Sequence, residues 1–195
     1  MAAAGTALVG STSPYAWAQD DSPTEFDYVL GDDDAPVTVI EYASFTCPHC
    51  AAFHADTLPQ LKTNYIDTGQ VRMVFRHFPL NGLDLQAGMM ATCLGEDLYL
   101  RIADVLFSTQ QDWVQSNDQL GALSRIARQA GLSEEAFNQC VNDQELAERI
   151  VASRQQAIDS YGVQSTPTFV VNGEVLAGNR PYEFWADTLD PLVGS

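Results

Sequence analysis

Two cysteines separated by two residues, Cys47 and Cys50, are the clearest chemical signal in the chain. They follow an apolar, β-branched run at 37–45 that predicts a buried strand, and they precede apolar spacing typical of a helix. Cys47 would therefore lie at the first turn of that helix, where Pro48 is tolerated and where unpaired amides, the helix dipole and His49 favour a thiolate. Cys50 is expected one turn further in, less exposed, and able to resolve a mixed disulfide formed at Cys47. The motif predicts a disulfide that is readily passed to other thiols.

Glu41 is the one acidic residue of the predicted strand, six positions before Cys47. Burying a carboxylate is costly unless it has a partner or a task. One interpretation is a carboxyl group of raised pKa that passes protons to and from Cys50. The alternative is a carboxylate at the rim of the sheet that reaches solvent, because Asp and Glu are rarely buried.

The other two cysteines, Cys93 and Cys140, lie in helix-forming sequence with no cationic neighbours to activate them. Four cysteines allow three pairings, and the short loop of the first pair favours pairing these two with each other. A structural disulfide is expected in an exported chain, and two buried free thiols are the alternative. A zinc site that combines the first cysteine pair with His54 and His77 is a further alternative, although a second close ligand pair is missing. Otherwise both histidines are interpreted as surface or helix-facing polar residues, and no metal is expected.

The order of the predicted elements indicates an α/β fold. Alternating or continuous apolar patterns predict strands at 37–45, 71–76, 168–171 and 174–176. Asn172-Gly173 joins the last two strands and predicts a tight hairpin, because both residues must adopt positive φ. Residues 84–161 carry only helical periodicity, and an amphipathic helix ends the chain. A parallel βα unit followed much later by an antiparallel hairpin implies one mixed sheet with an inserted helical lobe.

The composition excludes two classes of function. The 195 residues carry 26 acidic and 9 basic side chains, a net charge of −17. Nucleic-acid binding needs a basic stripe, and an anionic membrane surface would repel such a chain. The length suits one domain with a core of its own.

The N-terminal region divides into two segments. Residues 1–18 are uncharged and end in Ala16-Trp17-Ala18, which matches the end of a secretory signal without its basic start. A signal-peptide remnant is therefore the favoured interpretation, and a flexible Ala/Gly/Ser leader is the alternative. Residues 19–36 are acidic and turn-rich and are interpreted as a surface arm. The apolar run is too short to span a bilayer, so we expect an exported protein that is soluble after signal removal.

The segment from Val39 to Cys50 resembles the active-site segment of the DsbA family of thioredoxin-fold thiol:disulfide oxidoreductases, whose motif is also Cys-Pro-His-Cys. The resemblance continues through Arg76-His77-Phe78-Pro79-Leu80, the helical insertion and Gln164-Ser165-Thr166-Pro167-Thr168-Phe169. It implies a thioredoxin-like domain at 37–83 and 162–195 and an inserted helical domain at 84–161. It also implies a cis-proline loop at Thr166-Pro167 that faces the cysteines and pairs with an extended substrate segment.

The resemblance implies a monomeric oxidase that gives the Cys47–Cys50 disulfide to thiols of unfolded or reduced exported proteins. Reoxidation by a quinone-linked membrane oxidase, a periplasmic location and no cofactor beyond the disulfide are implied with it. Thr166 departs from this pattern, because DsbA-type oxidases often carry Val there and the threonine resembles isomerases and reductases of the superfamily. Those periplasmic isomerases have a separate dimerisation domain, for which residues 19–36 are too short. An isomerase or reductase, or a non-catalytic client-binding chaperone, remains an alternative.

Overall fold

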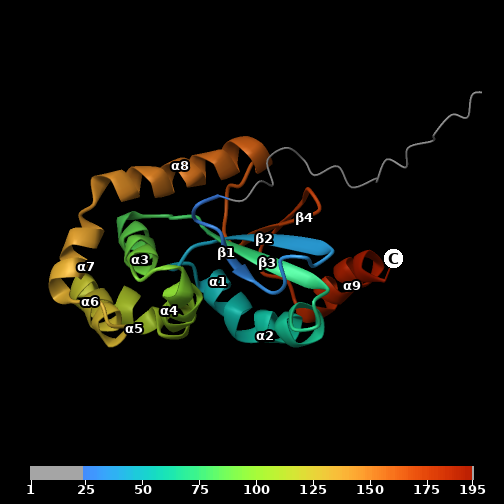
Figure 1. Ribbon diagram of the computed structural model, residues 1–195, viewed down its shortest axis with the longest axis horizontal. Coiled ribbons are helices and arrows are strands. Elements are labelled where there is room, and N and C mark those ends of the chain that lie inside the picture. The colour runs from blue at the N-terminus through green and yellow to red at the C-terminus, as the bar shows by residue number, and fades with distance from the viewer. Residues whose placement is uncertain (1–23, 195) are drawn as a thin grey trace, which may run out of the picture.

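The computed structural model describes residues 24–194, which form a mixed five-stranded sheet in the order β1-β3-β2-β4-β5 (Figure 1). The strands are β1 (Tyr28–Leu30), β2 (Val37–Ala43), β3 (Val71–His77), β4 (Thr168–Val171) and β5 (Glu174–Ala177). The two central neighbours β2 and β3 run parallel, and the other neighbouring pairs run antiparallel. The signal segment predicted at 1–18 lies outside the described residues.

A single helical segment follows β2 and carries the cysteine motif. It comprises α1 (Pro48–Ala52), α2 (Leu58–Leu61) and two π-helical stretches, η1 (Phe53–Thr57) and η2 (Lys62–Ile66). The wide turns of η1 directly precede Pro59, which has no amide hydrogen for an α-helical bond. Gly69 follows with a φ of 73°, a conformation that glycine adopts without strain.

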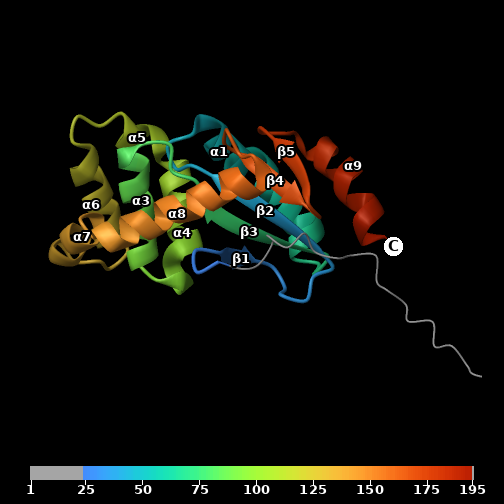
Figure 2. The same cartoon turned by 90° about the horizontal axis from the view of Figure 1, so that it is seen from above.

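Six helices separate β3 from β4 and gather largely at one end of the sheet (Figure 1). They are α3 (Gly82–Cys93), α4 (Glu96–Ser108), α5 (Gln110–Val114), α6 (Gln119–Gln129), α7 (Glu134–Val141) and α8 (Gln144–Tyr161). Viewed from above, α8 runs from this lobe back over the sheet, and α9 (Tyr182–Val193) lies at the opposite end (Figure 2). No helix within residues 24–194 is long and apolar enough to cross a bilayer.

The sheet is buried on both faces, which explains why β2 is apolar along its whole length. Val37 and Val39 pack on one face with side chains of the motif helix and with Trp185 of α9. Ile40 and Tyr42 pack on the other face against α8. Because side chains alternate along a strand, Glu41 lies on the same face as Val39, toward the motif helix.

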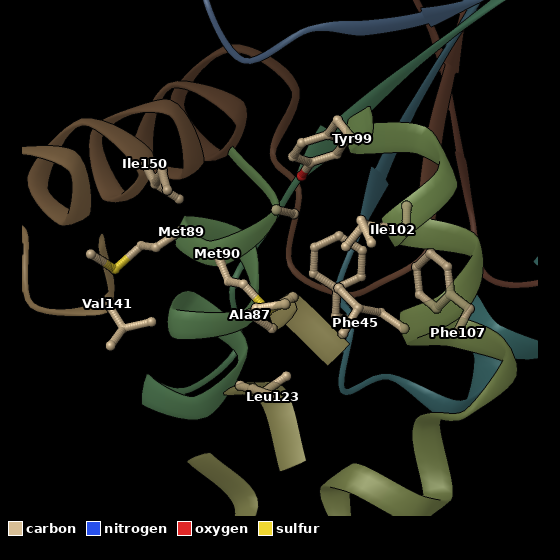
Figure 3. Close-up of a cluster of buried hydrophobic side chains, with 14 of the residues drawn as sticks. Phe45, Ala87, Met89, Met90, Tyr99, Ile102, Phe107, Leu123, Val141 and Ile150 are labelled. Atoms are coloured by element: carbon tan, nitrogen blue, oxygen red, sulfur yellow. The ribbon is translucent and has the colours of Figure 1, made fainter. Parts of the chain in front are cut away.

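A third core fills the lobe and reaches the segment just before the motif. Phe45 lies among side chains of the lobe, with Met90 of α3 and Phe107 of α4 in the same cluster (Figure 3). A disulfide joins Cys93 at the end of α3 to Cys140 in α7. The lobe and the redox segment therefore share one hydrophobic cluster.

The interpretation of residues 19–36 as a surface arm needs correction for its described part, residues 24–36. Tyr28–Leu30 forms an edge strand antiparallel to β3, and Phe26 and Tyr28 are buried. Asp27 is half-buried, with a side chain that is 6% exposed, and it forms a bidentate ion pair with Arg76, at 2.6 and 2.8 Å. A three-residue strand is too short to show an alternating pattern of apolar and polar residues. The interpretation as a surface arm therefore rested on the acidic residues around the strand. By contrast, Asn172 and Gly173 adopt φ values of 49° and 82°, as predicted for the hairpin.

Candidate active site

The register of the sheet brings the cysteine motif beside the Thr166-Pro167 segment. Tyr42 of β2 lies opposite Thr168 of β4, so the end of β2 is adjacent to the start of β4. The Cys47 thiol donates a hydrogen bond to the backbone carbonyl of Thr166, at 3.2 Å. The Thr166–Pro167 peptide bond is cis, as the resemblance implied.

Cys47 is the N-cap residue of α1, and Pro48 occupies the first turn. The hydrogen bond with the Cys50 thiol contributes most to lowering the pKa of Cys47 to about 5, against the opposing effect of burial. The Thr166 side chain and the backbone amides of Cys50 and His49 lower this pKa further. Both amides lie in the first turn of the helix, at the positive end of its dipole, and so help to stabilise an anion, although the Cys50 amide also donates to the Cys47 carbonyl at 3.1 Å. The side chains of Pro48 and His49 are exposed.

Cys50 has the opposite environment. Its side chain is fully buried, and this burial raises its pKa far above the usual value for a thiol. The hydrogen bond with Cys47 and the negative charge of Glu41 raise the pKa further. At neutral pH the structure therefore favours a thiolate on Cys47 and keeps the proton on Cys50.

Glu41 is completely buried beneath the motif helix, which excludes the alternative of a solvent-exposed carboxylate at the rim. Its Oε2 atom lies 3.0 Å from Nε2 of His54, whose side chain is 8% exposed. The ring of His54 also packs against Phe107, with 4.1 Å between ring centroids. Of the two interpretations of His54, a surface residue or a helix-facing polar residue, the structure supports the second. Its spacing held a signal, because a residue four positions after Cys50 lies on the same helix face.

Asp84 at the start of α3 organises the loop that leads into the motif. It is fully buried and accepts hydrogen bonds from the Ser44 hydroxyl at 2.6 Å and from the backbone amides of Phe45 and Leu80 at 2.9 and 2.8 Å. His77 Nε2 lies 3.0 Å from the same carboxylate, so this histidine is also buried rather than a surface residue. Burial raises the pKa of Asp84, but His77 and the hydrogen-bond donors outweigh it and hold the pKa below its usual value.

Gln110 in α5 holds the same loop from the lobe. Its side-chain amide donates to the carbonyl of Phe45 at 2.8 Å and to that of Cys47 at 3.0 Å. Sequence reasoning missed this residue, because a glutamine in a helix gives no sign of a partner more than 60 positions away. The lobe thus positions the backbone on which Cys47 stands.

A surface pocket of about 890 Å³ lies between the motif helix and helices α4 and α5. Glu41, His54 and Asp104 are among the residues that line it, and Phe107 forms part of its apolar wall. Nowhere in residues 24–194 do three or more His, Cys, Asp or Glu side chains form a group that could hold a metal ion.

Comparison with known proteins assigns the chain to a family. A family model described as Thioredoxin matches residues 23–191. The crystal structure of alpha-DsbA1 from Wolbachia pipientis is similar, with a TM-score of 0.80 and 34% identity over 88% of this chain and 93% of that one. The chain belongs to the DsbA family of the thioredoxin superfamily. Its mixed sheet, inserted helices and Cys-Pro-His-Cys motif agree with this assignment, so the predicted thioredoxin fold is confirmed.

Other relatives of this DsbA-family chain carry related names. A putative protein-disulfide oxidoreductase of Rickettsia bellii is 35% identical over 150 residues, which cover 76% of this chain and 58% of that protein. Disulfide bond formation protein D of Bacillus subtilis is 26% identical over 174 residues. The chain spans between 54% and 60% of the length of the Rickettsia proteins that it matches.

Proposed function

We propose that this protein is a protein-disulfide oxidoreductase that donates the Cys47–Cys50 disulfide to thiols of unfolded or reduced exported proteins. The observation that carries the proposal is the opposite displacement of two neighbouring thiol pKa values, lowered at Cys47 and raised at Cys50. A stabilised Cys47 thiolate favours the reduced state over the disulfide, so the disulfide is a good oxidant. The names of the Rickettsia and Bacillus relatives support the same reaction class.

The proposed reaction proceeds through a mixed disulfide. A client thiolate attacks Sγ of Cys47, the Cys47–Cys50 bond breaks, and the sulfur of Cys50 leaves and takes up a proton, which Glu41 supplies. A second client thiolate then attacks the client sulfur of the mixed disulfide and releases Cys47 as a thiolate. The client loses two electrons, and the protein gains them in its dithiol. The disulfide accepts both electrons, so no further cofactor is proposed.

The client segment is proposed to bind at the Thr166-Pro167 loop. The Thr166 carbonyl already accepts a hydrogen bond from Cys47, so a strand that pairs with this backbone would bring its cysteine beside the reactive sulfur. The family assignment supports the remaining steps: reoxidation by a quinone-linked membrane oxidase, a periplasmic or otherwise exported location, and action as a monomer.

The redox equilibrium of the Cys47–Cys50 pair with glutathione tests the direction of electron flow. We expect a potential well above the roughly −270 mV of a cytosolic thioredoxin. A potential as low as that value would refute the oxidase and favour a reductase. Oxidation of a reduced, unfolded ribonuclease should be fast and should be lost in Cys47→Ala.

An isomerase is the second candidate, because Thr166 precedes the cis-proline, where the residue resembles isomerases and reductases of the superfamily rather than oxidases with valine. Repair of ribonuclease with scrambled disulfides, compared with oxidation of the reduced ribonuclease, separates the two activities. Faster repair than oxidation would favour the isomerase.

Two alternatives from other classes have tests of their own. Protection of client proteins that persists in Cys47→Ala, after oxidase activity is lost, would support a binding chaperone. Stoichiometric zinc in the purified protein would support a zinc-binding module.

A further inference from the structure

The carboxylate that serves Cys50 lies at the wall of the pocket between the motif helix and helices α4 and α5, but it is itself buried. Glu41 is 0% exposed, so any proton it gives to Cys50 must be replaced through a neighbouring group. Its Oε2 atom is 3.0 Å from Nε2 of His54, which is within hydrogen-bonding distance. Its other oxygen, Oε1, is buried without a hydrogen-bond partner among residues 24–194. Glu41 therefore has one clear route for proton exchange within the protein.

His54 is held in a fixed orientation at the wall of the pocket. Its ring lies 4.1 Å from Phe107 and 5.9 Å from Phe75, measured between ring centroids, so helix α4 and strand β3 both confine it. With Nε2 directed at Glu41, the second ring nitrogen Nδ1 is buried and has no hydrogen-bond partner among the described residues, so a proton reaches it only when water or a neighbouring side chain enters from the pocket. An imidazole can accept a proton at one nitrogen and release one from the other, which makes such a ring suited to relaying protons.

His54 lines the pocket of about 890 Å³, and 8% of its side chain is exposed there. Asp104 of α4 lines it with an exposed side chain and interacts electrostatically with His54. The other titratable groups that line the same pocket are Tyr28 of β1, Lys62 of η2 and Asp112 of α5. Only Glu41 among these groups makes a hydrogen bond with His54 in the part of the chain that the structure describes. The order from inside to outside is therefore Glu41, His54, Asp104.

We infer that His54 relays protons between Glu41 and the solvent in this pocket, with Asp104 positioning the outer end of the path. The inference rests on the proposed function, in which Cys50 takes up one proton when it leaves and loses one when it attacks. On client oxidation Cys50 takes its proton from Glu41, Glu41 takes one from His54, and His54 takes one from solvent. On regeneration each transfer is reversed, so the protein returns to its starting protonation state with no further reactant.

Rapid-quench oxidation of the reduced protein by glutathione disulfide tests the relay. The attack of Cys47 on glutathione disulfide gives a rate that rises with its concentration, whereas the later attack of Cys50 on the mixed disulfide sets a concentration-independent limit. In His54→Gln we expect the first rate to be unchanged and the limiting rate to fall by about a hundredfold, the lower end of the range that positioned proton transfer contributes. The limiting rate of the variant should then rise in proportion to hydroxide concentration, because solvent must remove the proton.

A matched pair of pocket variants provides the control. Asp104→Asn should slow the limiting rate, while Asp112→Asn, which removes a carboxylate from the same pocket, should leave it unchanged. Equal effects of the two substitutions would overturn the assignment of Asp104. A His54→Gln protein with the limiting rate and pH profile of the wild type would overturn the relay as a whole. If the wild-type protein showed no first step, the proposed function would fail instead, so the two failures are distinguishable.

Chemical rescue separates a proton relay from a structural role of His54. His54→Ala opens additional space beside a pocket that is already large enough for a small heterocycle. Added imidazole should restore the limiting rate in proportion to its concentration, whereas pyrazole, which has the same size but is a far weaker base, should not. Equal rescue by both compounds, or rescue by neither in a variant with wild-type circular dichroism, would overturn the inference.

Discussion

The lowered pKa of Cys47 predicts how the stability of the reduced protein depends on pH. In the folded protein this pKa is about 5, against a value of 9.0 for an ordinary thiol. The folded protein therefore binds the thiol proton of Cys47 less tightly than the unfolded chain does. The resulting stabilisation is present above the unfolded pKa and is lost as the pH falls through about 5. The oxidised protein has no such titration, because a disulfide carries no acidic proton.

The magnitude follows from the two pKa values. Between pH 6 and pH 8 the free energy of unfolding of the reduced form should increase, relative to the oxidised form, by about 1.4 kcal/mol per pH unit. At pH 7 the contribution is about 2.7 kcal/mol, which corresponds to about 60 mV in the potential of the pair. Cys47 is only 6% exposed, so solvent screening reduces these values little. Below about pH 8 the Cys50 thiol stays protonated in both states, because its pKa is raised in the folded protein and is that of an ordinary thiol in the unfolded chain, so Cys50 adds little to the slope.

Urea unfolding of the oxidised and reduced forms at several pH values between 5 and 8 measures this slope. Thiol counting should show two thiols in the reduced form, so that the Cys93–Cys140 disulfide is the same in both. Cys47→Ser provides the control, because it keeps the fold and Cys50 but lacks the titrating thiolate. A stability difference that does not change with pH, or one that decreases as pH rises, would refute the reasoning.

Three further predictions concern contacts outside the redox pair. Replacing Asp27 by Asn should lower the free energy of unfolding by about 3 kcal/mol or more, as urea titration would show, because the buried charge of Arg76 loses its carboxylate. Gln110→Leu should cost about 1–3 kcal/mol in the same assay, because it removes two buried hydrogen bonds to the loop before the motif, and an unchanged stability would contradict that role. Replacing Cys93 and Cys140 together by Ala should cost up to about 4 kcal/mol while leaving the rate of glutathione disulfide attack unchanged, and a slower attack would show that the disulfide also shapes the active site.

Local features of the sequence were sufficient to predict the reactive pair and most of the fold. The motif follows an apolar strand and begins a helix, and its chemistry depends on backbone amides that every helix N-terminus presents. The hairpin at Asn172-Gly173 was predictable for a similar reason, because the positive φ of both residues is a local requirement. Local backbone conformations such as these are set by a few neighbouring residues, and the rest of the chain changes them little.

The tertiary structure decided which distant groups meet these local features. The contact of Cys47 with Thr166 spans 119 positions and requires the antiparallel register of β2 and β4. The pairing of Glu41 with His54 depends on how the motif helix packs over the sheet. Each residue alone is of a polar type that is usually at least partly exposed, so the sequence does not indicate that the two meet in the interior. Strand β1 is likewise set by pairing with β3, because three residues hold too little pattern to specify a strand. The sequence by itself determined that Cys47 and Cys50 lie at the start of a helix behind a buried strand, where a reactive thiol pair is predicted, and only the packed structure decided their electrostatic surroundings, because those arise from side chains that folding brings together.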